Sequence, residues 1–84
     1  MTDTEAKKVA DLLKTGKQYK QGHYQQGYES FEFVEKDNLF KYTREETGLD
    51  WFNPLVTKAL LTEKEFLVKM TDNFNYEEFI NNLI

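Results

Sequence analysis

The chain of 84 residues contains no cysteine, one proline, four glycines and one histidine. Without cysteine it forms neither a disulfide nor a thiolate metal site, which fits a reducing compartment. The first residues, MTDTEAKK, lack the basic and apolar regions of a signal peptide, and no apolar run approaches the roughly 18 residues that span a bilayer. We therefore expect a cytoplasmic protein that does not use a membrane as a partner.

Residue types that usually perform catalysis are also scarce. His23 is the single histidine and lies in a polar stretch, and Ser30, the single serine, has no Gly-x-Ser-x-Gly motif around it. The acidic residues Glu45 and Glu46 are chain neighbours, so in a helix their carboxylates diverge instead of converging on one point. We expect no enzymatic activity, no cofactor and no metal site.

Aromatic residues are plentiful, because seven Phe, five Tyr and one Trp make up 15% of the chain. Each such ring can bury about 150–250 Å² of surface. A chain of this size forms one small domain, here residues 1–84, with limited room for a core. We expect the core to consist largely of rings.

The first predicted element is a helix over residues 3–15. Ala6, Val9, Ala10 and Leu13 recur at helical spacing. Thr2 with Glu5 has the spacing of a capping box at the start.

The stretch YESFEFVEKDNLFKYTRE favours a β-hairpin, with its loop at Glu35 to Asn38, over a helix. The pairing that this loop imposes is Val34 with Leu39, Phe33 with Phe40, and Phe31 with Tyr42. The hairpin gathers four rings on one face, whereas a helix would point Phe33 away from the other rings. Two strands alone are marginal in water, so this face needs helices packed on it.

The segments on either side of the hairpin are predicted from glycines and caps. Residues 17–27 predict a loop or an irregular, locally extended segment, with an alternative in which helix continues to Gln21 and turns at Gly22. Thr43 with Glu46 permits one helical turn.

The C-terminal part of the chain predicts helix. Asn53 and Pro54 resemble the start of a helix over residues 54–71, although Thr62 with Glu65 can instead begin a second helix there. A last helix follows Asn75, with Glu78 at its third position and with Phe74 and Phe79 spaced as a hydrophobic staple.

Together these elements define the expected fold class. It is α+β, with an N-terminal helix, an aromatic β-hairpin and two or three C-terminal helices packed on it. The alternative is an all-α helical bundle.

Charge gives the main indication of function. The net charge is −4, and residues 1–28 carry five Lys against three acids, whereas residues 29–84 carry six basic residues against twelve acids. We expect a protein that binds another, basic protein through an acidic face. One version is an inhibitor that occupies a basic nucleic-acid-binding partner, as phage-encoded inhibitors and nuclease immunity proteins do by charge complementarity.

The alternative function is binding of single-stranded nucleic acid through residues 14–28, where lysines alternate with tyrosines. A few lysines compete poorly with the acids downstream, so we rank nucleic acid below protein as a partner. Tyrosines are also enriched in protein interfaces. The candidate partner-binding residues are Tyr19, His23, Tyr24, Tyr28, Glu45, Glu46, Asp50 and Trp51.

Burial decides what these tyrosines do. If Tyr19, Tyr24 and Tyr28 are exposed together they form a contact surface, and if they are buried they join the helix to the hairpin. Trp51 either fills the core at a chain reversal or anchors a partner.

Overall fold

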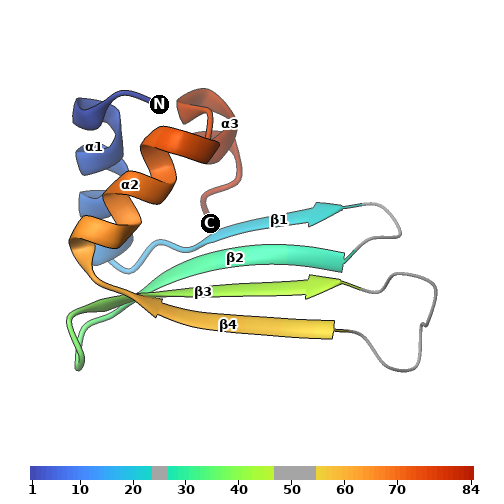
Figure 1. Cartoon of the computed structure of the whole chain (residues 1–84). Helices are drawn as coiled ribbons and strands as arrows, with labels where there is room; N and C mark the ends of the chain where they lie inside the picture. Colours follow the sequence, from blue (N-terminus) through green and yellow to red (C-terminus); the bar gives the residue numbers. More distant parts are fainter. Residues whose placement is uncertain (24–26, 47–54) are drawn as a thin grey trace.

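The structure is a computed structural model, and it describes residues 1–23, 27–46 and 55–84. Within these residues, three helices lie on one face of a four-stranded antiparallel sheet, toward one end of its strands (Figure 1). The order along the chain is α1 (Asp3–Lys14), β1 (Tyr19–His23), β2 (Gly27–Val34), β3 (Leu39–Glu46), β4 (Leu55–Leu61), α2 (Glu63–Asn73) and α3 (Tyr76–Asn81). The predicted α+β class is confirmed, and the all-α alternative is wrong.

Helix α1 follows its local sequence. Thr2 Oγ1 accepts a hydrogen bond from the backbone N–H of Glu5 (3.1 Å), and the Glu5 carboxylate accepts one from the backbone N–H of Thr2 (2.9 Å). The predicted capping box is therefore present. The apolar stripe from Ala6 to Leu13 is buried. After the helix, Gly16 adopts a φ of 101°, a conformation that favours glycine.

Strands β2 and β3 form the aromatic hairpin in the predicted register. Val34 pairs with Leu39, Phe33 with Phe40, and Phe31 with Tyr42. Asn38 closes the turn with a φ of 54°, a left-handed conformation that asparagine tolerates better than most residues. Alternation of rings therefore identified both the strands and their alignment.

Strand β1 replaces the loop that the sequence predicts over residues 17–27. It pairs antiparallel with β2, from Tyr19 opposite Phe31 to His23 opposite Gly27. The extended form of that prediction is confirmed for these five residues, the unpaired loop is wrong for them, and the alternative helix through Gln21 is wrong. Hydrogen bonds from β2 hold the segment extended, and a pattern within β1 alone does not reveal such a distant partner.

Strand β4 replaces the first half of the helix predicted over residues 54–71. It pairs with β3, from Phe40 opposite Leu61 to Glu46 opposite Leu55. The helical turn predicted from Thr43 to Glu46 is also wrong, because these residues belong to β3. The proposed helix start at Asn53 and Pro54 lies outside the described residues.

Helix α2 begins at the alternative start. Thr62 Oγ1 accepts the backbone N–H of Glu65 at 3.2 Å, and the Glu65 carboxylate accepts the backbone N–H of Thr62 at 3.0 Å. The helix buries Phe66 and Met70 against the sheet. The prediction that Thr62 starts a separate helix is confirmed.

Helix α3 starts as predicted. Asn75 Oδ1 accepts the backbone N–H of Glu78 at 3.1 Å. The rings of Phe74 and Phe79 meet edge to face with centroids 5.8 Å apart, as a hydrophobic staple requires.

Aromatic rings fill the space between the sheet and the helices. Phe31 is fully buried, and its ring lies within 6 Å of five others, those of Tyr19, Tyr42, Phe66, Phe74 and Phe79. Phe40 stacks on Phe66 with ring centroids 4.2 Å apart. The expected core of rings is confirmed.

The described helices are short. None is both long and apolar enough to cross a membrane.

Candidate protein-contact site

The predicted tyrosine strip divides between the two faces of the sheet. Tyr19 points toward the helices, is 1% exposed, and stacks on Phe79 with ring centroids 4.0 Å apart. Tyr28 is on the opposite face, where Lys20 Nζ lies 4.7 Å from its ring centroid. Tyr24 lies outside the described residues. Tyr19 therefore joins β1 to α3 and is not available to stack on a base.

Of the other predicted contact residues, Glu45 lies directly opposite Tyr28 on the face away from the helices, and the rest do not join this pair in one described patch. Glu45 and Glu46 are neighbours in β3, so their side chains point to opposite faces of the sheet. Glu46 pairs with Arg44, with Nε and Oε1 2.8 Å apart. His23 ends β1, and Asp50 and Trp51 lie outside the described residues.

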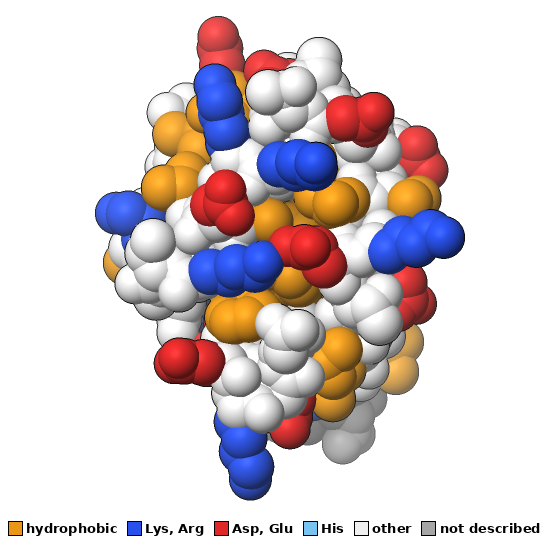
Figure 2. All heavy atoms as spheres, turned by 90° about the vertical axis from the view of Figure 1, so that its left-hand side faces the viewer, with side chains coloured by type: hydrophobic (Ala, Val, Ile, Leu, Met, Phe, Trp, Pro, Cys, Tyr) orange, Lys and Arg blue, Asp and Glu red, His pale blue; other side chains and the backbone are white. Residues whose placement is uncertain are grey.

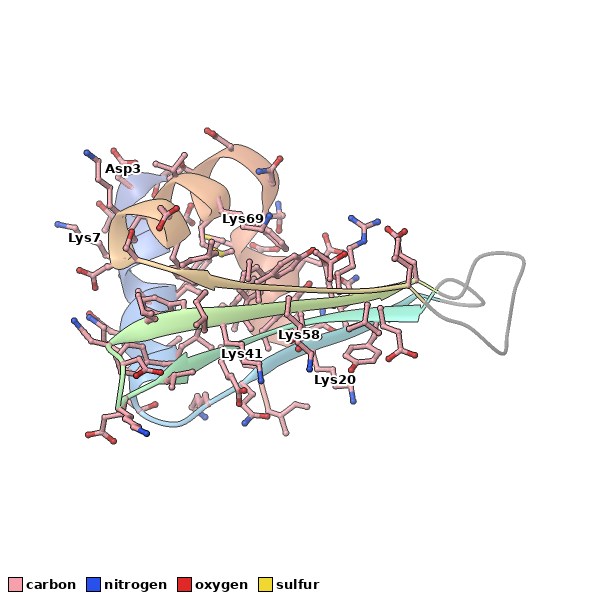
Figure 3. The ribbon with its side chains drawn as sticks, turned by 60° about the horizontal axis from the view of Figure 1, so that its bottom comes forward. Asp3, Lys7, Lys20, Lys41, Lys58 and Lys69 are labelled. Atoms are coloured by element: carbon pink, nitrogen blue, oxygen red, sulfur yellow. The ribbon has the colours of Figure 1, made fainter. Side chains whose placement is uncertain are left out.

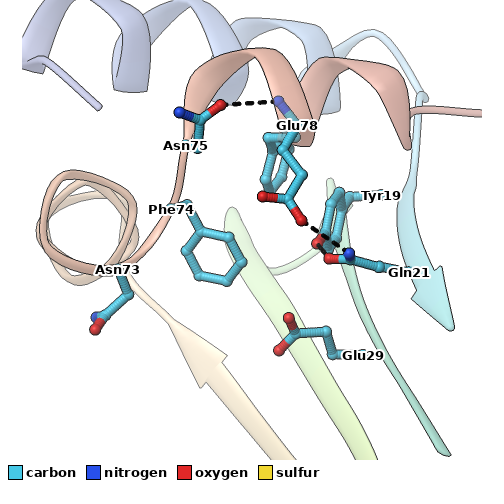
Figure 4. Close-up of a pocket in the computed structure, with 8 residues that line it drawn as sticks. Tyr19, Gln21, Glu29, Asn73, Phe74, Asn75 and Glu78 are labelled. Atoms are coloured by element: carbon cyan, nitrogen blue, oxygen red, sulfur yellow. Dashed lines mark hydrogen bonds between the residues drawn. The ribbon is translucent and has the colours of Figure 1, made fainter. Parts of the chain in front are cut away.

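A hollow of about 210 Å³ opens where β1 and β2 meet the connection between α2 and α3 (Figure 4). We call it the acidic pocket. It is lined by Tyr19, Gln21, Glu29, Asn73, Phe74, Asn75, Glu78 and Phe79. Three of these side chains are aromatic, three are amides and two are carboxylates.

Hydrogen bonds hold one wall of the acidic pocket. The Tyr19 hydroxyl donates to Gln21 Oε1 at 2.5 Å, and Gln21 Nε2 donates to Glu78 Oε1 at 3.0 Å. The Asn75 side chain caps α3 by accepting a hydrogen bond from the Glu78 backbone N–H, and the Glu78 carboxylate faces β1 (Figure 4). This chain of contacts connects the first strand of the sheet to the last helix.

The second carboxylate comes from the sheet. Glu29 lies on the same face of β2 as Phe31, and the Tyr42 hydroxyl donates a hydrogen bond to Glu29 Oε2 with an oxygen–oxygen distance of 3.0 Å. Burial, and then this hydrogen bond, raise the pKa of Tyr42. Burial, followed by the charges of Glu29 and Glu78, raises the pKa of Tyr19. Both hydroxyls donate hydrogen bonds, Tyr19 to Gln21 and Tyr42 to Glu29, and the raised pKa values extend this donor role further into alkaline pH.

The chemistry of the acidic pocket suits a cation. Two carboxylates and three amide oxygens are acceptors, and two of these amide oxygens already accept hydrogen bonds from Tyr19 and from the Glu78 backbone. None of the described residues that line the pocket is lysine or arginine, but Arg44 lies directly opposite Glu29 in β3, on the same face of the sheet. Aromatic side chains form the remaining wall, and ring faces attract cations. Among the described residues no group of three or more His, Asp or Glu side chains is arranged to hold a metal ion.

Sequence reasoning missed this pocket. It assigned Glu78 only to a helix start and did not single out Glu29 or Gln21 as contact residues. A signal for Glu29 was present, because residues 29, 31 and 33 share one face of a strand. A carboxylate in line with Phe31 and Phe33 therefore had to lie beside the aromatic core.

Lysines gather on the opposite side of the sheet, which the helices leave open. Lys20, Lys41 and Lys58 point away from the helices (Figure 3). Lys20 and Lys58 lie at the two ends of one row across the sheet, with Ser30 and Thr43 between them. We call this surface the open face. Lys41 has an acidic neighbour, with its Nζ 3.8 Å from a Glu32 oxygen.

The helices carry most of the acidic excess. Their acidic residues are Asp3, Glu5, Asp11, Glu63, Glu65, Asp72, Glu77 and Glu78, and their basic residues are Lys7, Lys8, Lys14, Lys64 and Lys69. At the end of the molecule seen in Figure 2, acidic and basic side chains alternate and neither sign forms a separate patch. The acidic pocket lies at another part of the surface, and its described lining contains two carboxylates and no lysine or arginine. A neighbouring hollow that includes Glu5, Asp72 and Glu77 in its lining also contains neither lysine nor arginine.

Comparisons with models of protein families, with curated proteins and with solved structures found no match.

Proposed function

We propose that this protein acts by binding another protein, and that the acidic pocket receives an arginine or lysine side chain of that partner. The observation behind the proposal is that Glu29 and Glu78 line one hollow together with the rings of Tyr19, Phe74 and Phe79. A guanidinium or ammonium group can hydrogen-bond to carboxylates while it lies against rings.

The expected energies are large enough for one such side chain to act as an anchor. A hydrogen bond to a charged group contributes about 1.5–3 kcal/mol, and a cation–ring contact about 0.5–2 kcal/mol. The acidic excess of the helices adds an attraction of longer range, which raises the association rate with a basic partner. Binding should therefore weaken as salt concentration rises.

The more specific form of the proposal is an inhibitor of the immunity type. In the cytoplasm, an acidic protein of this size would occupy the basic surface of a nucleic-acid-binding protein and so compete with the nucleic acid. Small size, a net charge of −4 and an acidic pocket support this form.

The test uses a short peptide with one central arginine and a matched peptide with neutral citrulline in its place. The arginine peptide should shift the side-chain amide NMR signals of Gln21 and Asn75, and the citrulline peptide should not. Glu78→Gln should weaken binding about 10- to 100-fold, because it removes one charge-assisted contact.

Glu77→Gln is the matched control, because Glu77 is also an acid in the first turn of α3 but does not line the acidic pocket. It should change affinity by less than about 2-fold if only long-range attraction is lost. Equal binding of both peptides, or equal loss in both variants, would show that the pocket recognises no cation.

The inhibitor form has a separate test. Immobilised protein should capture a basic protein from the source cell, and nucleic acid should displace it. Capture that does not respond to salt would contradict a mechanism based on charge.

The open face supports a second candidate function, the binding of single-stranded nucleic acid. Lys20, Lys41 and Lys58 provide cations there, and Tyr28 provides a half-buried ring on the same face. Labelled single strands should then bind at low salt, and Tyr28→Ala and Lys58→Ala should each weaken the binding. Retention of binding in both variants would exclude the open face.

A further inference from the structure

The two edges of the sheet differ in how they are covered. Residues at the end of the chain run along the outer edge of β1, where Ile84 N–H donates to the Gln18 carbonyl at 2.8 Å and Lys20 N–H donates to the Asn82 carbonyl at 3.2 Å. β4 is the last strand at the other edge, and within residues 1–23, 27–46 and 55–84 no segment pairs with its outer side (Figure 1). An uncovered edge presents backbone donors and acceptors to another strand.

The side chains of β4 suit an added strand. Leu55 is 64% exposed, Val56 46% and Leu60 55%, which is unusual for large apolar side chains, and Lys58 is the single charged residue of the strand. These residues divide between both faces of the sheet. Successive side chains of a strand added beside β4 would point to opposite faces of the sheet, and on each face they would cover apolar side chains of β4.

A hollow adjoins β4 on each face. The hollow on the open face has a volume of about 530 Å³, and its lining is Val34, Asp37, Lys41, Lys58, Ala59 and Leu60. The hollow on the helix side, about 440 Å³, includes Leu61 and Val68, which is 53% exposed. Both could accept apolar side chains from a strand added at this edge.

Charge decides which strand fits. If β4 of a second copy paired antiparallel over all seven residues, Leu55 would face Leu61 and Val56 would face Leu60. The same register places Lys58 directly opposite Lys58 of the second copy, and like charges in that position are destabilising. A strand with a carboxylate at its centre would keep the apolar pairs and replace this repulsion with an attraction.

We propose that the β4 edge binds an extended segment of another protein, antiparallel to β4, with apolar residues on both faces and a carboxylate opposite Lys58. Lys58 selects this segment and disfavours pairing with a second copy. The site is separate from the acidic pocket, which lies at β1 and β2, so either proposal can fail without the other.

The test uses the chain itself as the probe. Lys58→Glu supplies a β4 strand with a carboxylate at the right position, so an equal mixture of wild type and Lys58→Glu should form a heterodimer that neither protein forms alone. Sedimentation or native mass spectrometry detects it, and salt should weaken it.

Lys20→Glu is the matched control. It makes the same charge change on the open face, but at the opposite edge of the sheet, so its mixture with wild type should remain monomeric. Association of this control, or no association of the Lys58→Glu mixture, would overturn the proposal. Dimers of wild type alone that pair through β4 would overturn the selective role of Lys58.

A second measurement uses two blocked peptides with the β4 sequence, one of which has glutamate in place of the central lysine. The glutamate peptide should bind roughly 2- to 30-fold more tightly, from the usual range for cross-strand charge pairs. It should also slow hydrogen exchange of β4 amides and leave β1 amides unchanged. Equal affinity of the two peptides, or protection of β1 instead, would contradict the assignment.

Discussion

Replacing three glycines by alanine, one at a time, tests how closely β2 approaches β3. Gly16 and Gly27 share a φ of 101°, whereas Gly22 has an ordinary φ. A Cβ added at Gly16 or Gly22 meets nothing within 4 Å, but one added at Gly27 would lie 1.7 Å from the Glu45 carbonyl oxygen. The three substitutions therefore differ in conformation and in packing, and each effect can be measured separately.

The magnitudes follow from these differences. Gly22→Ala should stabilise by about 0.4–1 kcal/mol, because it only restricts the unfolded chain. Gly16→Ala should destabilise by about 1–3 kcal/mol from backbone strain. Gly27→Ala carries the same strain of about 1–3 kcal/mol. It also separates two strands, which costs one or two further hydrogen bonds of about 0.5–1.5 kcal/mol each, so we expect a total of about 1.5–6 kcal/mol, always above the loss at Gly16.

The loss at Gly27 is large beside the total stability of about 4–13 kcal/mol expected for a domain of this length. Urea unfolding followed by circular dichroism measures all three free energies, with an unchanged m-value as the check for two-state unfolding. Hydrogen exchange should quicken around Tyr28 and Glu45 in the Gly27→Ala variant. If Gly27→Ala costs no more than Gly16→Ala, the close approach of Gly27 to β3 is refuted.

Three further predictions concern the core, a helix cap and alkaline pH. Phe31→Ala should cost about 4–5 kcal/mol in urea unfolding, whereas half-buried Phe33→Ala should cost about 1–2 kcal/mol, and equal losses would contradict a core centred on Phe31. Thr62→Ala should cost about 1 kcal/mol by thermal unfolding. The Thr62 backbone N–H, and then its side chain, lower the pKa of Glu65, so this contribution is present above about pH 4.5 and is lost on further acidification. Thr62→Ala keeps the backbone donor and should retain most of this decline in acid, whereas Glu65→Gln should flatten it. Folding raises the pKa of Tyr19 above 10.0, so its contribution is complete below pH 10 and is lost as pH rises further, and Tyr19→Phe should flatten this alkaline decline in unfolding free energy.

Local signals predicted the helix starts because caps are made within a few residues. Thr2 with Glu5, Thr62 with Glu65, and Asn75 with the Glu78 backbone all form the hydrogen bonds that their spacing implies. The β2–β3 register was also readable, since aromatic residues alternate on both sides of a four-residue turn. In each case the interacting groups are close in the chain.

The edge strands were not readable for the opposite reason. β1 is five residues long and includes Gly22, so its extended form depends on pairing with β2. β4 has apolar residues on both faces, so its sequence lacks the alternation of apolar and polar residues that identifies a strand. The same apolar residues also fit the spacing of one face of a helix. The exposed Leu55, Val56 and Leu60 that misled the prediction are the same residues that make the β4 edge a candidate binding site.

The acidic pocket could be predicted only in part. The strand period placed Glu29 beside the core, but Glu78 reaches the same hollow from α3 by way of the turn at Phe74 and Asn75. No spacing in the sequence relates these two carboxylates. Their approach depends on α3 packing against β1, which is fixed by the stacked rings of Tyr19 and Phe79.

The spatial division of charge also differs from the division along the chain. Residues 1–28 are basic and residues 29–84 acidic, yet the open face combines Lys20 from the first part with Lys41 and Lys58 from the second (Figure 3). The helices likewise combine acids from both parts of the chain. Strand alternation creates this arrangement, because it sends neighbouring residues to opposite faces. The helix side therefore favours a basic partner, while Lys58 at the β4 edge favours an acidic segment, and a single partner that uses both sites must itself present both charges.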